Sequence, residues 1–130
     1  MEQRKKILIV DDDSFLVDMY ALKFGKFNFS VTGALSAKEA LDKIRSGFVP
    51  DIILVDVVMP EMDGFDFMEK MKSENLAKDS IKIILSNRGQ QTDIVRGESL
   101  GAVGYVVKAS STPTEVIEKI NEIINNLEQK

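Results

Sequence analysis

The sequence predicts an α/β protein built on a five-stranded parallel sheet, doubly wound, with strand order 2-1-3-4-5. Short, continuous apolar runs alternate with segments of helical spacing, and this alternation uses the whole chain without a spare segment. Such apolar runs are typical of strands that are buried on both faces of a parallel sheet. A chain of 130 residues suffices for one core, so we expect a single domain over residues 1–130.

The first strand and helix come directly after a short polar start. Residues 7–10 (ILIV) form an apolar run, and residues 14–26 then show helical spacing, with Asp13 or Ser14 as the expected N-cap. Residues 28–34 alternate apolar and polar side chains, which indicates a strand with one more exposed face. The apolar side chains that we expect on one side of the first helix are Phe15, Leu16, Met19 and Leu22.

The middle of the chain holds the second helix, the central strand and the third helix. Residues 36–39 (SAKE) form a capping box, and Gly47 ends the helix that it starts. Residues 51–55 are the central strand, and residues 64–73 show helical spacing. We expect Asp63 and Gly64 to open this helix rather than to bind a ligand.

Two further strand–helix units complete the pattern. Residues 81–85 and 104–107 are apolar runs, and residues 92–100 form a weaker helix, since Gly97 costs about 1 kcal/mol relative to Ala in a helix. Residues 112–115 (TPTE) supply an N-cap, a proline at the first position and a glutamate at the third, and a clear amphipathic helix follows. The order of elements is that of a flavodoxin-like (βα)5 fold.

The composition excludes several classes of function. The chain has no cysteine and no histidine, so disulfides, thiolate zinc sites and histidine-based catalysis are excluded. The net charge of -4 argues against direct nucleic-acid binding and against binding to an anionic membrane. The N-terminal apolar run is too short for a signal peptide, and we expect a cytoplasmic protein that is not anchored in a membrane.

Polar side chains end four of the five predicted strands. The first strand ends in Asp11 and Asp12, the third in Asp56, the fourth in Ser86 and the fifth in Lys108. Ligands of open parallel sheets bind beyond the carboxyl ends of the strands, at the switch point between strands 1 and 3. We therefore expect these five side chains to converge on one crevice.

The chemistry of this set indicates phosphoryl transfer. Three carboxylates crowd together only if they lose charge or bind a cation, and oxygen ligands without His or Cys select magnesium, manganese or calcium. An aspartate can act as a nucleophile and form an acyl phosphate. The set fits transfer onto Asp56, with the metal and Lys108 balancing charge and Ser86 binding an equatorial oxygen.

Four motifs, in order and at the expected strand ends, carry a resemblance that covers nearly the whole chain. They are ILIVDDD at the start, LVDVVMPEMDG in the middle, IILS in the fourth strand and GYVVK in the fifth. The chain resembles the receiver domain of two-component response regulators. No output domain follows, so the resemblance implies a stand-alone receiver or a receiver cut from a longer chain.

The resemblance implies a role for each matching residue. Asp56 would be the phosphoacceptor, Ser86 and Tyr105 the switch pair, and Lys108 the residue that contacts the phosphoryl group. Mg²⁺ would be bound by the following groups: Asp12 directly, Asp11 mainly through water, the Asp56 carboxylate and the main-chain carbonyl of Val58.

The same resemblance implies partners. The phosphodonor would be a sensor histidine kinase, a histidine phosphotransfer protein or a small phosphodonor. Phosphorylation would switch the surface formed by residues 92–100, residues 104–107 and the final helix, for binding of a downstream protein or for self-association as a homodimer. Such a domain assists its own phosphorylation and dephosphorylation but is not a turnover enzyme.

Two positions depart from the family pattern. Receivers usually follow the lysine of the fifth strand with proline, often in a cis peptide, whereas this chain has Ala109. A cis bond before Ala costs about 2.5–4 kcal/mol, so either the loop is trans or strain is stored there. Receivers also usually have a small residue after Ser86, whereas this chain has Asn87 and then Arg88, which can crowd or hydrogen-bond the phosphoryl pocket.

Two alternative functions remain open from the sequence. One is a binding module with a receiver fold that works without phosphorylation. The departures from the family pattern at Asn87 and Ala109 support this alternative. The other is a magnesium-dependent phosphohydrolase with an aspartate nucleophile. Haloacid-dehalogenase-like enzymes carry a second Asp two residues after the first. This chain has Val58 at that position, which argues against a phosphohydrolase of this kind.

Overall fold

A computed structural model describes residues 4–128 of the chain, and all five predicted strands are present in one parallel sheet. The sheet order is β2-β1-β3-β4-β5, as predicted. The strands are β1 (Lys5–Val10), β2 (Phe29–Ala34), β3 (Ile52–Val55), β4 (Ile81–Ser86) and β5 (Ala102–Val107).

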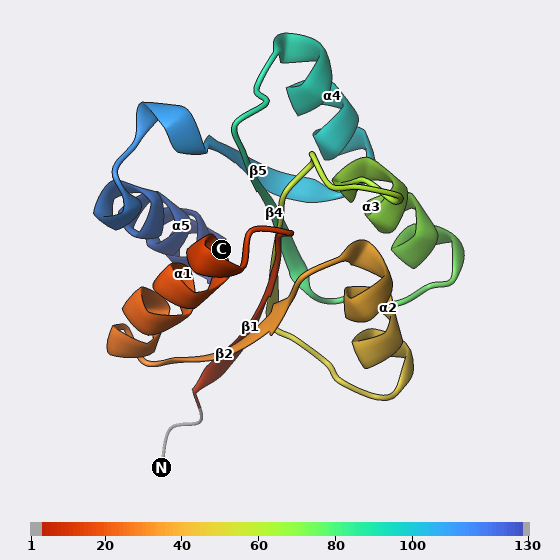
Figure 1. The fold of residues 1–130 in the computed structure, drawn as a ribbon, viewed down its shortest axis with the longest axis horizontal. Helices are drawn as coiled ribbons and strands as arrows, with labels where there is room; N and C mark the ends of the chain where they lie inside the picture. The colour runs from red at the N-terminus through yellow and green to blue at the C-terminus, as the bar shows by residue number, and fades with distance from the viewer. Residues whose placement is uncertain (1–3, 129–130) are drawn as a thin grey trace.

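Helices cover both faces of this sheet (Figure 1). The helices are α1 (Ser14–Lys26), α2 (Ala37–Arg45), α3 (Gly64–Ser73), α4 (Gln91–Ser99) and α5 (Pro113–Glu128), and a 3-10 turn, η1 (Lys108–Ser110), follows β5. Helices α1 and α5 lie on one face, and α2, α3 and α4 lie on the other (Figure 1). Among the described residues, no helix is long and apolar enough to cross a membrane.

The central strands are apolar throughout because they face two cores. In β1, Leu8 and Val10 pack in the core under α2 and α3, whereas Ile7 and Ile9 pack in the core under α1 and α5. Successive side chains of a strand point to opposite faces, so a strand covered on both sides reads as an uninterrupted apolar run. All four side chains are at most 2% exposed.

The strand register places the ends of β1 and β3 next to each other. Val10 is paired with Val55, and the backbone N–H of Asp56 donates to the carbonyl of Val10 at 2.9 Å. On the other side of β1, the N–H of Asp11 donates to the carbonyl of Ala34 at 3.1 Å. Asp11 and Asp56 are therefore the first residues beyond two neighbouring, hydrogen-bonded strands.

The helix starts follow the predicted capping patterns. The Asp13 carboxylate accepts hydrogen bonds from the first turn of α1, and Ser36 and Asp63 cap α2 and α3. Thr112 and Glu115 exchange side-chain and backbone hydrogen bonds at the start of α5. Each cap satisfies N–H groups that have no partner within the helix, which fixes where the chain turns after a strand.

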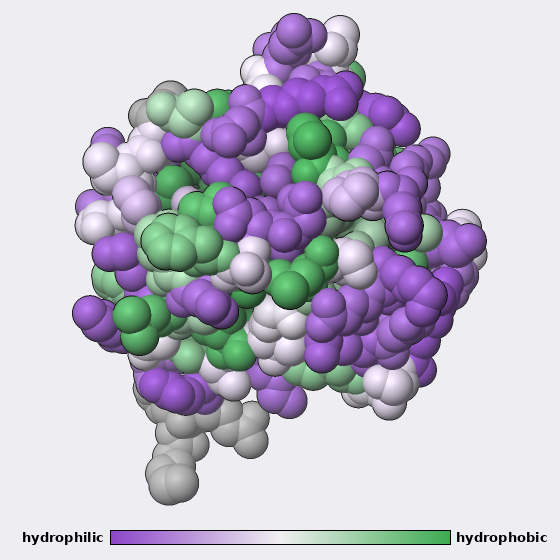
Figure 2. All heavy atoms as spheres, viewed as in Figure 1, coloured by the Kyte–Doolittle hydropathy of each residue, from purple (hydrophilic) through white to green (hydrophobic). Residues whose placement is uncertain are grey.

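The prediction for the apolar face of α1 was half right. Leu16 and Met19 are partly buried and pack against the core, whereas Phe15 is 74% and Leu22 is 68% exposed. The buried side chains of α1 are Val17, Tyr20 and Phe24. Both stripes have helical spacing, and the sheet covers the one that contains two aromatic rings. Apolar residues consequently lie on the molecular surface on the α1 side of the view in Figure 2.

Several element boundaries differ from the prediction by one or two residues. Strand β1 begins at Lys5 and β5 at Ala102, because ladder pairing with β2 and β4 extends beyond the apolar runs. Helix α4 runs over Gln91–Ser99 and keeps Gly97 because a β-carbon there would lie 2.5 Å from Cδ1 of Ile84. The glycine lets this helix pack closely on β4.

Candidate functional site

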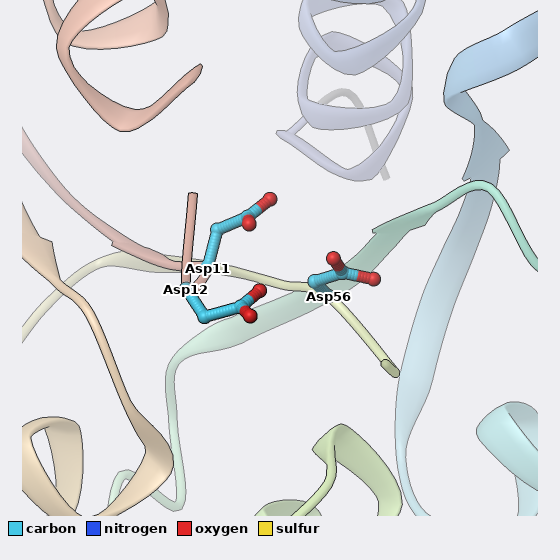
Figure 3. A group of neighbouring side chains, drawn as sticks. All are labelled: Asp11, Asp12 and Asp56. Atoms are coloured by element: carbon cyan, nitrogen blue, oxygen red, sulfur yellow. The ribbon is translucent and has the colours of Figure 1, made fainter. Parts of the chain in front are cut away.

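Three aspartates lie together at the carboxyl edge of the sheet (Figure 3). Asp11 and Asp12 follow β1, Asp56 follows β3, and one carboxylate oxygen from each lies within 4.8 Å of the others. Asp11 is 4% and Asp56 is 9% exposed, whereas Asp12 is exposed. The site therefore has two buried carboxylates and a third that is open to solvent.

Lys108 is the cation of this site. Its Nζ donates to Oδ2 of Asp11 at 2.5 Å and to Oδ2 of Asp56 at 3.2 Å, and its side chain is only 8% exposed. The described residues contain no cis peptide bond, so the bond between Lys108 and Ala109 is trans. A trans loop with alanine in place of the usual proline thus still directs the lysine into the carboxylate cluster.

The charges of this cluster alter its protonation. Burial raises the pKa of Asp11, although the hydrogen bond from Lys108 acts in the opposite direction. Burial lowers the pKa of Lys108, but the hydrogen bond to Asp11 and the charge of Asp56 outweigh it, so that its pKa is raised overall. Lys108 is therefore a firmly protonated point charge between two carboxylates.

Backbone N–H groups hold the other oxygens of the two buried carboxylates. The N–H of Asp13 donates to Oδ1 of Asp11 at 3.0 Å, and that of Val58 donates to Oδ1 of Asp56 at 3.2 Å. Each buried carboxylate thus has one oxygen fixed by its own loop and the other by Lys108. The side chain of Val58 is 57% exposed. The role predicted for this residue, as a metal ligand, involves only its main-chain carbonyl.

Gly64 allows the loop after β3 to fold back on Asp56. A β-carbon at Gly64 would lie 2.3 Å from the carbonyl oxygen of Asp56 and 2.9 Å from Cα of Val57. The N–H of Gly64 also donates to the carbonyl of Val57 at 2.9 Å. The sequence predicted Gly64 as a helix start, which is confirmed, but gave no sign of this close approach.

Ser86 and Tyr105 both form hydrogen bonds with the backbone of Arg88. The N–H of Arg88 donates to Oγ of the fully buried Ser86 at 3.2 Å, and the hydroxyl of Tyr105 donates to the carbonyl of Arg88. The predicted switch pair is thus joined through one residue of the loop between β4 and α4. Asn87 is exposed.

Asp93 is a buried acid that the sequence reasoning did not single out. It is 4% exposed, its Oδ1 accepts from Nε of Arg88 at 3.1 Å, and its Oδ2 accepts from the N–H of Gln90 at 3.2 Å. The one signal in the sequence is its place three residues after the N-cap Gln90, where an acidic side chain can bond back to the cap.

The donor set fits a hard divalent cation. Three carboxylates supply oxygen ligands only, and the chain has no imidazole or thiolate to offer. Mg²⁺ is usually held by one or two carboxylates and retains further positions for water or phosphate oxygens. Asp12, the exposed member, faces the solvent from which such an ion would enter.

Comparison with known proteins gives one consistent family. Residues 7–121 match the response regulator receiver domain. The response regulator SaeR of Staphylococcus aureus is 33% identical over 123 residues, which cover 95% of this chain and 52% of that protein. The chain thus spans about half the length of the curated relatives that it matches.

Solved structures agree with this match. A CheY-like receiver domain protein from Methanospirillum hungatei superposes with a TM-score of 0.83 at 29% identity, over 97% of this chain and 98% of that one. The chemotaxis protein CheY4 of Vibrio cholerae gives a TM-score of 0.82 at 26% identity, over 92% and 98% of the two chains. The chain therefore belongs to the response regulator receiver domain family of two-component signalling.

Proposed function

We propose that this chain accepts a phosphoryl group on Asp56 from a partner phosphohistidine or from a small phosphodonor. The observation that carries the proposal is the shared lysine: Nζ of Lys108 contacts both Asp11 and Asp56, and the Asp12 carboxylate lies in the same cluster. A nucleophilic carboxylate thus lies between a cation and two further acids that suit a metal ion.

In the proposed reaction a carboxylate oxygen of Asp56 attacks phosphorus. The new bond is the P–O bond of an acyl phosphate, and the bond that breaks is the P–N bond of the donor phosphohistidine or the P–O bond of a small acyl phosphate. The leaving imidazole or carboxylate keeps the bonding electron pair. Lys108 stays protonated throughout and shifts its contact from the carboxylate to the phosphoryl oxygens.

Asp12, Asp56 and, through water, Asp11 would hold Mg²⁺ in the proposed site, together with the carbonyl of Val58. When bound, such an ion would supply positive charge to offset the negative charge on the phosphoryl oxygens. The N–H of Val58, which donates to Oδ1 of Asp56, orients the carboxylate so that its other oxygen is the one shared with Lys108.

Phosphorylation adds about -1.5 to -2 charge at the end of β3. We expect the Ser86 hydroxyl to donate to a phosphoryl oxygen and the segments around β4 and β5 to settle in a second arrangement. Tyr105, on β5, reports this change to the surface formed by α4, β5 and α5. That surface would bind a downstream protein or a second copy of the chain.

A single incubation separates this function from the two alternatives. The protein is mixed with Mg²⁺ and acetyl phosphate, and both the protein-bound phosphate and the released inorganic phosphate are measured. A receiver retains a hydroxylamine-labile phosphoryl group, at no more than one per chain. Release of phosphate over many cycles would instead indicate a phosphohydrolase. Absence of both would indicate a binding module that works without phosphorylation.

A further inference from the structure

The loop between β4 and α4 is held by three contacts that meet at Arg88. Its backbone N–H donates to Oγ of Ser86, its carbonyl accepts from the hydroxyl of Tyr105, and its Nε donates to Oδ1 of Asp93. Ser86 ends β4, Tyr105 is on β5 and Asp93 is in the first turn of α4. One residue therefore touches three elements around the phosphoacceptor pocket.

Asp93 is a strong anchor because it is buried and charged. A buried carboxylate is costly unless it is paired and hydrogen-bonded, and Asp93 satisfies this with Arg88 and with the N–H of Gln90. Its position at the N-terminus of α4 adds favourable interaction with the helix dipole. The guanidinium of Arg88 thus has one preferred partner, which itself is fixed to α4.

Gly89 lets the loop pass close to β5 directly after this anchor. Gly89 follows Arg88, and a β-carbon at Gly89 would lie 2.4 Å from Cγ2 of Val107. The loop therefore passes close to the end of β5 through a residue that has a wide choice of backbone conformation. The ion pair with Asp93 adds a side-chain anchor to the two backbone hydrogen bonds that Arg88 makes with Ser86 and Tyr105.

We propose that Arg88, held by the buried Asp93, is a positioning residue that couples the Ser86 hydroxyl to Tyr105. This inference rests on the proposed phosphorylation of Asp56 for its role in signalling. The Ser86 oxygen accepts from Arg88 and still has its own proton to donate to a phosphoryl oxygen. When Ser86 moves toward that oxygen, the Arg88 N–H moves with it, and the carbonyl that holds Tyr105 moves too.

The pKa of Tyr105 depends on the charges of the Arg88–Asp93 pair and on the charge of Asp56. The pKa of Tyr105 is raised to about 12, first by burial and then by the charge of Asp93; the charge of Arg88 acts in the opposite direction, and the charge of Asp56 makes the smallest contribution. The Tyr105 phenol therefore responds to a change of charge at the phosphoacceptor and to a change in the Arg88–Asp93 pair.

The first test uses protein that has not been phosphorylated. The chain has two tyrosines, so incorporation of 3-fluorotyrosine gives two fluorine NMR signals, and Tyr105→Phe assigns them. We expect Arg88→Ala and Asp93→Asn each to shift the Tyr105 signal, and the double variant to shift it no further, because both act through one ion pair. Additive shifts, or none in Arg88→Ala, would overturn the proposal.

A matched control and a conservative variant exclude a general loss of structure. Arg45→Ala removes another arginine–carboxylate pair, which joins the end of α2 to Glu74 at the end of α3, and should leave the Tyr105 signal in place. Arg88→Lys keeps a cation for Asp93 and should restore most of the wild-type signal position. Thermal melting of each variant checks that it folds.

The second test uses protein treated with Mg²⁺ and acetyl phosphate, with the phosphorylated fraction read by intact mass on the same sample. At equal phosphorylation, the displacement of the Tyr105 signal in Arg88→Ala should be about half that of wild type or less. An equal displacement would overturn the coupling. If wild type takes up no phosphate, the proposed function fails, and the first test, on unphosphorylated protein, alone decides the role of Arg88.

Discussion

Nζ of Lys108 lies 3.2 Å from Oδ2 of Asp56 while it donates to Asp11 at 2.5 Å, so one cation at the end of β5 holds the carboxylates that follow two other strands. This relationship joins residues that are 52 and 97 positions from Lys108 in the sequence. It depends on the sheet order, which brings the ends of β1, β3, β4 and β5 to one edge. The proposed chemistry follows from this convergence.

Replacing Lys108 should slow phosphorylation strongly. Lys108→Met removes the charge and keeps a similar length, so the rate of phosphate uptake from acetyl phosphate should fall by about 100-fold. Lys70→Met removes an exposed lysine of α3 and should react at the wild-type rate. The rates are read by intact mass over time. Equal rates for Lys108→Met and wild type would remove Lys108 from the proposed site.

Mg²⁺ should stabilise the fold through Asp12. Binding at 100 times the dissociation constant adds about 2.7 kcal/mol to the free energy of unfolding, which thermal melting detects. Asp12→Asn should lose most of this increase. Asp13→Asn is the matched control, because Asp13 caps α1 with its carboxylate and asparagine also caps well. An equal response to Mg²⁺ in Asp12→Asn would place the ion elsewhere.

Two glycines should respond oppositely to alanine. Gly64→Ala places a β-carbon against the Asp56 carbonyl and should lower the free energy of unfolding by about 1–3 kcal/mol and slow phosphorylation. Gly25→Ala, in α1, meets nothing within 4 Å and should raise it by about 0.5–1 kcal/mol. Urea denaturation measures both. A stable, fully active Gly64→Ala protein would contradict the tight packing of this loop.

The ionisation of Tyr105 should weaken the fold at high pH. Its pKa is about 12 in the folded protein, against 10.0 for the solvent-exposed side chain of the unfolded chain. The folded protein therefore holds the proton longer, and this contribution to stability is complete below pH 10 and lost as the pH rises to about 12. Tyr105→Phe should show a smaller loss of stability over this range, measured by urea denaturation at each pH.

The same titration tests the effect of Asp93 on the phenol. Asp93→Asn removes a charge that raises the pKa of Tyr105, so this pKa should fall while burial still keeps it above 10.0. Ultraviolet absorbance of the phenolate measures it, with Tyr105→Phe giving the signal of Tyr20 alone. An unchanged pKa in Asp93→Asn would mean that the two side chains do not interact.

Sequence patterns sufficed to predict the fold because the apolar runs and the helix-capping residues indicated the same order of strands and helices. The apolar run of residues 7–10 predicted a doubly covered strand, and capping residues such as Ser36 and Asp63 marked where helices begin. The doubly wound order expected for five strand–helix units matches the observed sheet, and that order brings the three aspartates together.

Features that depend on three-dimensional packing were not visible in the sequence. The stripe of Phe15 and Leu22 has the same helical spacing as the buried stripe of Val17, Tyr20 and Phe24, and only the placement of α1 on the sheet selects between them. The bond between Arg88 and Asp93 likewise depends on how the β4–α4 loop turns back on its own helix. Local pattern carries no information about such a turn.

The most direct test of the central claim is the intact mass of wild type, Asp56→Asn and Asp63→Asn after incubation with Mg²⁺ and acetyl phosphate. Asp63 is the N-cap of α3 in the same loop, and asparagine retains that role. We predict one hydroxylamine-labile phosphoryl group on wild type and on Asp63→Asn, and none on Asp56→Asn. Labelling of Asp56→Asn to the level of wild type, or no labelling of wild type with any donor, would contradict the assignment of Asp56 as the phosphoacceptor.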